Sequence, residues 1–89
     1  MAEQKALDGK TVIVTGAGRG IGRAIALSAA RAGASVVLAS RTEEQLQEVV
    51  REVASFGGAA VGVPCDVRRA ADVERLVARA VAETGRLDA

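Results

Sequence analysis

The sequence is poor in the side chains that build metal sites and disulfides. Its 89 residues contain no histidine, tryptophan, tyrosine or asparagine, and a single cysteine, Cys65. Without histidine and with one cysteine, the common zinc ligand sets cannot be assembled and no internal disulfide can form. We therefore expect no metal site.

Aromatic side chains, excess charge and long apolar runs are also missing. The formal net charge is +1 and aromatic residues make up 1%, so the basic and stacking surfaces of a nucleic-acid-binding protein are not expected. The first ten residues are polar, without the apolar core of a signal peptide, and no apolar run approaches the roughly 18 to 20 residues of a membrane span. We expect a cytoplasmic protein with no nucleic-acid partner and no membrane segment.

The composition that remains is globular. Hydrophobic residues make up 49% of the chain and charged residues 26%. A chain of this length can form one small domain at most, which we place over residues 1–89.

Three apolar runs alternate with three amphipathic runs. Strands are expected at 11–15, 35–39 and 59–63, the last closed by Pro64, which cannot donate to a ladder. Helices are expected at 21–32, from Thr42 to the residue before Gly57, and over a stripe from Val73 to Val81 that ends at Gly85.

Local patterns make two of these helices more specific. In the first, Ile21, Ile25, Ala29 and Ala32 share a face that we expect to pack on the sheet. In the second, Thr42 and Gln45 have capping-box spacing, so the threonine hydroxyl should accept from an orphan N–H while the glutamine reaches back.

The alternation predicts the α/β class. Short connections between strands and helices favour a parallel sheet in a βαβαβα arrangement, a Rossmann-like three-layer fold with strand order 3-2-1. That order places the turn after the first strand and the ends of the other two strands along one edge, where a ligand should bind.

A glycine-rich turn joins the first strand to the first helix, with the pattern Thr15-Gly16-x-x-x-Gly20-x-Gly22. Such a turn can hold a phosphate, because the first N–H groups of a helix have no internal partner. The P-loop pattern fails, since Arg23 and Ala24 follow the last glycine in place of Lys-Ser/Thr, and G-x-G-x-x-G also fails in either register.

This motif resembles the cofactor signature T-G-x-x-x-G-x-G of the short-chain dehydrogenase/reductase family. The resemblance runs from Leu7-Asp8-Gly9-Lys10 to Gly85-Arg86-Leu87-Asp88, and covers only the first part of the family's fold. It implies a dinucleotide loop from Thr15 to Gly22 that includes Gly18. In that loop Gly16 makes the tight turn, Gly20 lets the backbone approach the pyrophosphate, Gly22 allows close packing, and the Ile21 N–H donates to phosphate.

The end of the second strand bears on which dinucleotide binds. NAD-specific sites have an Asp or Glu there for the ribose 2′-hydroxyl, whereas this chain has Ser40 and Arg41. With Arg19 in the glycine loop, this is similar to the family's NADP-preferring pattern, which implies NADP(H) as the cofactor. Alternatively, both arginines are solvated surface residues.

The end of the third strand supplies the adenine contact in this family. The resemblance implies that Asp66 accepts a hydrogen bond from the adenine amino group and that Val67 lines the ring. Asp66 could also be a helix N-cap or turn residue. We expect Cys65 to be a small buried side chain and Arg68-Arg69 to be a solvated pair.

The family's catalytic residues have no counterpart here. Members continue into a fourth strand with N-N-A-G, a catalytic serine and Y-x-x-x-K, but this chain has no tyrosine or asparagine, and its only lysines are Lys5 and Lys10. We expect no catalytic residue and no activity from this chain alone.

The sequence is therefore interpreted as the NADP(H)-binding N-terminal part of an oxidoreductase acting on a small carbonyl or alcohol, truncated before the fourth strand. Residues 86–89 resemble the approach to that strand. The open edge of the first strand predicts self-association.

Two other functions remain open. One is a non-catalytic nucleotide-binding or interaction module that uses the half-fold as it stands. The other is part of an S-adenosylmethionine methyltransferase, which has a similar glycine-rich loop. Ser40 and Arg41 argue against the second, because that cofactor's ribose diol usually meets an acidic residue at this position.

Overall fold

The structure is a computed structural model that describes residues 6–85, 87 and 88. Three strands alternate with three helices, as the apolar pattern predicts. They are β1 (Thr11–Thr15), α1 (Gly20–Arg31), β2 (Ser35–Ser40), α2 (Glu43–Ser55), β3 (Ala59–Pro64) and α3 (Ala70–Thr84). The expected approach to another strand includes Arg86 and Ala89, which lie outside the described residues.

The strands form one parallel sheet in the order β1-β2-β3. Thr11 is paired with Ser35, and Ser35 with Ala59, so the three strands start in step and their carboxyl ends reach the same edge. This confirms the predicted strand order and the Rossmann-like half-fold. Pro64 is the last residue of an edge strand, where a missing backbone donor does least harm.

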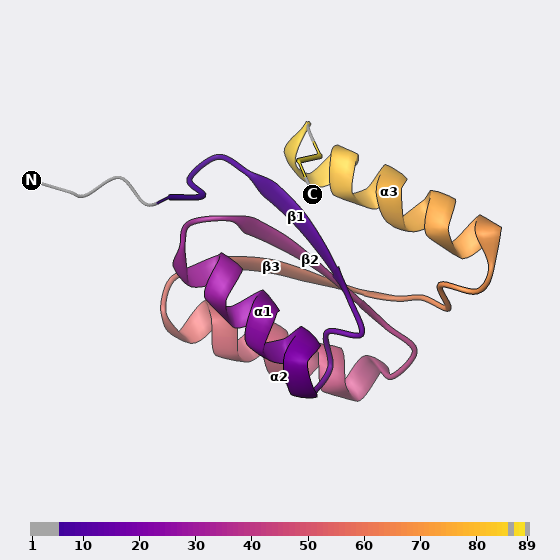
Figure 1. Ribbon diagram of the computed structural model, residues 1–89, viewed down its shortest axis with the longest axis horizontal. Helices are drawn as coiled ribbons and strands as arrows, with labels where there is room; N and C mark the ends of the chain where they lie inside the picture. The colour runs from indigo at the N-terminus through magenta and orange to yellow at the C-terminus, as the bar shows by residue number, and fades with distance from the viewer. Residues whose placement is uncertain (1–5, 86, 89) are drawn as a thin grey trace, which may run out of the picture.

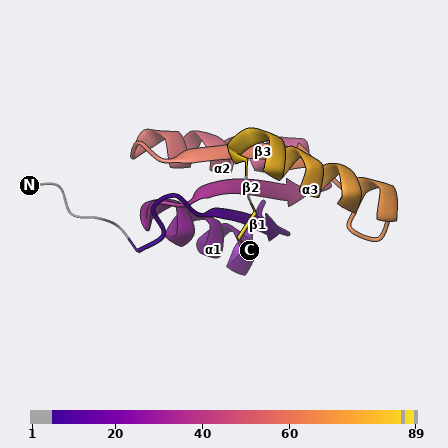
Figure 2. The ribbon, with the colours of Figure 1, turned by 90° about the horizontal axis from the view of Figure 1, so that it is seen from above.

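The helices cover the two faces of the sheet unequally. α1 and α2 lie on one face and α3 lies alone on the other (Figure 1; Figure 2 shows the same layers from above). Alternate residues of β2 point into two separate cores: Val36 and Leu38 pack with α1 and α2, whereas Val37 and Ala39 pack with α3. Because β2 is buried on both faces, its sequence is continuously apolar.

The predicted buried face of α1 was right for Ala29 and wrong for Ile21 and Ile25. Ile21 is 80% exposed and Ile25 is 50% exposed, and the buried residues are Ala26, Ala29 and Ala30. The cause is Gly22, where an added Cβ would lie 2.1 Å from the Gly16 carbonyl oxygen. This approach directs Gly22 inward, and the helical period then directs inward the residues four, seven and eight positions later.

The other two helices follow their stripes more closely. Leu46, Val49 and Val53 of α2 are fully buried. In α3, Leu76 and Ala80 are buried but Val73, Val77 and Val81 are exposed. Within the described part of the chain, no helix has the length and hydrophobicity needed to cross a bilayer.

Candidate functional site

Two backbone hydrogen bonds hold the carboxyl ends of the three strands together. The Ala17 N–H donates to the Ala39 carbonyl at 3.2 Å, which ties the glycine loop to the end of β2. The Cys65 N–H donates to the Ser40 carbonyl at 2.9 Å, which ties the end of β3 to the same place. The three loops predicted to carry the site are therefore fixed to one another by main-chain contacts.

The glycine loop has a shape that only glycine allows at three positions. Gly16 and Gly20 have φ of 65° and 62°, in the left-handed region that side chains disfavour. Gly22 packs against the Gly16 carbonyl with no room for a Cβ. α1 begins at Gly20, so the Ile21 N–H lies in the first turn, where helical N–H groups have no partner within the helix. The loop thus supplies outward-facing donors at its end.

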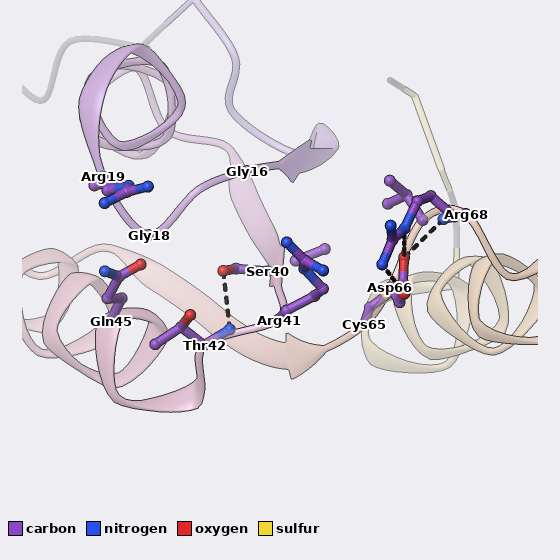
Figure 3. A pocket seen from close by; sticks show the side chains of 12 residues that line it. Gly16, Gly18, Arg19, Ser40, Arg41, Thr42, Gln45, Cys65, Asp66 and Arg68 are labelled. Carbon is purple, nitrogen blue, oxygen red and sulfur yellow. Dashed lines mark hydrogen bonds and ion pairs between the residues drawn. The ribbon is translucent and has the colours of Figure 1, made fainter.

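A cavity of about 450 Å³ lies between these loops (Figure 3). It brings together seven of the predicted site residues: Gly16, Gly18, Arg19, Ser40, Arg41, Asp66 and Val67. The other four are not in its lining: Thr15, Gly20, Ile21 and Gly22. Those four belong to the end of β1 and the start of α1, and they shape the loop rather than the cavity wall.

The cavity is positively charged. Its lining includes Arg19, Arg41 and Arg68, against one carboxylate, Asp66. Asp66 and Arg68 form an ion pair with each other, whereas neither Arg19 nor Arg41 forms an ion pair with any described residue. Two guanidinium groups are thus left facing a nucleotide-sized space, which suits an anionic ligand.

Asp66 is held at the cavity wall by Arg68. Arg68 donates from Nε to Oδ1 and from Nη2 to Oδ2, each at 3.0 Å, and its backbone N–H also donates to Oδ1 at 3.0 Å. These hydrogen bonds, with the nearby charges of Arg68 and Arg41, lower the pKa of Asp66 to about 2. The carboxylate stays ionised at neutral pH and, with two lone pairs on each oxygen, can still accept another donor.

This arrangement settles two expectations about the loop after β3. Asp66 is a turn residue and not a helix N-cap, because the N-cap of α3 is Arg69. Arg68 and Arg69 are both exposed, as expected of a solvated pair, but Arg68 also forms the ion pair with Asp66, which was not expected.

Asp72 is a supporting residue that the sequence interpretation missed. Its Oδ2 accepts a hydrogen bond from the Asp66 N–H at 2.9 Å, and Oδ1 lies 3.5 Å from Nη2 of Arg75. Arg75 in turn donates to the Pro64 carbonyl at 3.1 Å. The available signal was an acidic residue in the first turn of a helix, a position where a carboxylate can meet backbone N–H groups of the preceding loop.

Five lining residues were not predicted as site residues: Arg68, described above, and Ala39, Thr42, Gln45 and Cys65. The predicted capping box does not form, because Thr42 makes no side-chain cap hydrogen bond. Instead its N–H donates to Ser40 Oγ at 3.2 Å. Gln45, which we expected to cap the helix, therefore lies at the cavity wall (Figure 3).

Cys65 is the small buried side chain that we expected. It is 5% exposed, and burial raises the pKa of its thiol, as do the carboxylates of Asp72 and Asp66, against an opposing effect of Arg75. A neutral buried thiol is a poor nucleophile. Among the described residues, no group of three or more metal-ligating side chains comes together.

Comparisons with known proteins all point to one family. The sequence model of the short chain dehydrogenases matches residues 10–89. The hydroxynaphthalene reductase-like protein Arp2 of Metarhizium robertsii is 46% identical over 85 residues, which are 94% of this chain and 32% of that protein. The short chain dehydrogenase/reductase dmxR18 of a Cryptosporiopsis species is 48% identical over 83 residues, 92% of this chain and 31% of that protein.

Solved structures give the same result. A hydroxysteroid dehydrogenase from Escherichia coli superposes with a TM-score of 0.90 and 40% identity, covering 92% of this chain and 34% of that one. A 7α-hydroxysteroid dehydrogenase, complexed with NADH and 7-oxo glycochenodeoxycholic acid, has the same TM-score and identity, covering 92% and 32%. The chain thus spans about a third of the length of the relatives it matches.

Proposed function

The chain belongs to the short-chain dehydrogenase family, and on that premise we propose that it is the NADP(H)-binding part of an oxidoreductase that reduces a carbonyl or oxidises an alcohol. The family's cofactors are nicotinamide nucleotides, and the relatives are named as reductases or dehydrogenases. Since the chain spans about a third of their length, we assign it binding of the cofactor and assign the substrate site to the rest of a longer protein.

The observation that supports NADP(H) is the pair Arg19 and Arg41 at one cavity, with Ser40 where an NAD-specific site has a carboxylate. A carboxylate there would repel a 2′-phosphate, and a serine does not. Hydrogen bonds to charged groups contribute about 1.5 to 3 kcal/mol each, so two guanidinium groups would favour the 2′-phosphate by well over tenfold.

Further residues of the site support a position for the rest of the nucleotide. The pyrophosphate would lie at the start of α1, where the Ile21 N–H and its neighbours face outward and Gly16 and Gly20 keep the approach clear of side chains. The adenine would lie between Val67 and the glycine loop, with its amino group donating to the ionised Asp66. Val67 is exposed, as a ring-stacking side chain at a cavity wall must be.

When the cofactor is bound, its nicotinamide would supply the hydride for carbonyl reduction or accept it in alcohol oxidation. The residues of this chain bind and orient the nucleotide, but its sequence has no tyrosine to exchange a proton with the substrate. We therefore propose that the 89-residue chain has no oxidoreductase activity by itself. We also propose a cytoplasmic location and association of the chain with itself along β1.

The cofactor assignment is tested by Arg41→Asp in the longer oxidoreductase, with Arg51→Asp as the matched control. Arg51 is exposed on α2 and does not line the cavity, so it makes the same change of charge outside the site. We expect Arg41→Asp to lower the ratio of kcat/KM for NADPH over NADH by at least about tenfold, and Arg51→Asp to leave it unchanged. An unaltered ratio in Arg41→Asp would refute the assignment.

A further inference from the structure

Gln45 is a cavity residue to which the proposed function gives no role. It is half-buried on the first turn of α2 and lines the same cavity as Arg19 and Arg41. Its neighbour Leu46 is fully buried in the core, so the backbone that carries Gln45 is firmly anchored. Its side chain is therefore presented to the site by a fixed element and not by a loose loop.

The carboxamide of Gln45 is not used to cap its own helix. In a capping box it would accept the Thr42 N–H, but that N–H donates to Ser40 Oγ instead. No hydrogen bond joins Gln45 to any other described side chain. The amide thus keeps its donors and its acceptor available at the cavity wall.

The side chain lies directly against the glycine loop. A Cβ added to Gly18 would be 2.6 Å from Oε1 of Gln45 and 2.8 Å from its Cβ. In Figure 3 Gln45 rises from α2 toward Gly18, with Arg19 on the other side of the loop backbone and Ser40 and Arg41 further along the wall. Because the Ala17 N–H donates to the Ala39 carbonyl, the sheet sets the distance between this loop and α2.

We propose that Gln45 is a specificity-determining residue of this site, whose carboxamide donates a hydrogen bond to the 2′-phosphate of the nucleotide, beside the guanidinium groups of Arg19 and Arg41. This proposal rests on the proposed function. A neutral amide is suited to the place, because it adds a donor toward the phosphate without a further charge to desolvate. Its oxygen can accept an N–H of either arginine and so help to orient it.

The proposal predicts losses of 2′-phosphate affinity of different size from two substitutions of similar shape. Gln45→Glu puts a carboxylate where the phosphate would lie, which repels a 2′-phosphate and accepts a ribose 2′-hydroxyl. Gln45→Met removes the amide donor without adding charge. Both residues are good helix formers, and an acidic residue is favourable in the first turn, so α2 should be kept in each variant.

The experiment measures binding to the full 89-residue chain by isothermal titration calorimetry with two probes, adenosine 2′,5′-bisphosphate and 5′-AMP, which differ only in the 2′-phosphate. We expect Gln45→Glu to weaken the bisphosphate by at least about tenfold with AMP changed by less than about threefold, and Gln45→Met to weaken the bisphosphate alone by about threefold to tenfold. Gln47→Glu, the same change at an exposed position on the same helix, is the control and should leave the ratio unaltered.

The outcomes separate this proposal from the function on which it rests. The preference of the wild-type chain for the bisphosphate over AMP tests the proposed function, and its absence overturns both. If the wild-type chain prefers the bisphosphate and both Gln45→Glu and Gln45→Met keep that preference undiminished, the proposed role of Gln45 is overturned and the proposed function is not. Equal weakening of the two probes, with a lower melting temperature, would also overturn it, because Gln45 would then only support the loop.

Discussion

Asp88 and Thr11 are joined by two hydrogen bonds across a separation of 77 residues. The Thr11 N–H donates to Asp88 Oδ2 at 2.8 Å, and the Asp88 N–H donates to the Thr11 carbonyl at 3.0 Å. The Thr11 hydroxyl also donates to Thr84 Oγ1 at 2.6 Å, and Thr11 is only 1% exposed. Asp88 therefore lies beside the start of β1, and at Thr11 the strand edge is already covered.

Replacing Asp88 by alanine should destabilise the fold, because it removes the side-chain hydrogen bond to Thr11. The Thr11 N–H would lose its acceptor in a buried position, which costs about 1 to 3 kcal/mol. We expect urea denaturation, followed by far-ultraviolet circular dichroism, to give a free energy of unfolding lower by that amount. Asp88→Asn keeps an acceptor of the same shape and should lose less. If Asp88→Ala and Asp88→Asn both left the free energy of unfolding unchanged, the contact between Asp88 and Thr11 would not contribute to stability.

Gly22→Ala tests the approach of α1 to the glycine turn. The new Cβ would lie 2.1 Å from the Gly16 carbonyl oxygen, and backbone atoms on both sides cannot both give way. We expect a loss of about 3 kcal/mol in unfolding free energy, the upper range for overpacking, measured by thermal and urea melts. Gly9→Ala is the control, because Gly9 has φ of 78° but nothing within 4 Å of the added Cβ. Gly9→Ala should lower the free energy of unfolding by only about 1 to 2 kcal/mol, the cost of holding a residue with a Cβ in the left-handed region.

The strand order and the convergence of the loops could be predicted because they follow from hydrophobic periodicity and chain topology. The continuous apolar run of β2 and the stripe of α2 each have one physical explanation, burial on two faces and burial on one. The glycine spacing likewise allows few backbone paths, and Gly16 and Gly20 adopt the left-handed angles that such a turn needs. These features are local or nearly so.

The errors arose where a contact with the turn that precedes a helix decided between two local choices. The Gly22 approach to Gly16 turned the alanines of α1 inward and left Ile21 exposed, although isoleucine is the more hydrophobic residue. Ser40 took the Thr42 N–H and so released Gln45 from its expected cap. Neither competition can be judged from the helix sequence alone, because its outcome depends on the path of the turn before the helix.

Exposed apolar side chains flank β1 on both faces, and they should make the chain self-associate. On the α1 side a groove is lined by Leu7, Ile21, Ala24 and Ile25, with Ser28 and Ala29 completing it. On the α3 side Val77 is exposed. We expect the sedimentation coefficient to rise with concentration, and Ile25→Lys with Val77→Lys to suppress the rise by placing like charges along the edge. A monodisperse wild-type monomer that unfolds cooperatively would contradict this expectation.

Arg68→Ala should make the protonation of Asp66 visible in an accessible pH range. The hydrogen bonds and charge of Arg68 lower the pKa of Asp66 to about 2. Arg68→Ala removes the side-chain hydrogen bonds and the charge but keeps the backbone N–H, so the pKa should rise toward the ordinary aspartate value of 3.8. Because the folded-state pKa is lowered, the stabilising effect of the ionised carboxylate is present above the unfolded pKa and is lost as pH falls through about 2. Between roughly pH 4 and pH 2 the wild type should therefore keep an ionised Asp66 that the variant has lost.

The measurement is the carboxyl carbon chemical shift of Asp66 in a pH titration of both proteins, paired with AMP affinity over the same range. If the ionised carboxylate accepts a hydrogen bond from the adenine amino group, AMP affinity should be lost at a higher pH in Arg68→Ala than in the wild type. This shift should match the shift of the carboxyl titration. Arg69→Ala is the matched control, because Arg69 neighbours Arg68 in sequence but is the N-cap of α3 and makes no ion pair with Asp66. If the carboxyl titration moved to higher pH but AMP binding was lost at the same pH in both proteins, Asp66 would have no part in adenine recognition.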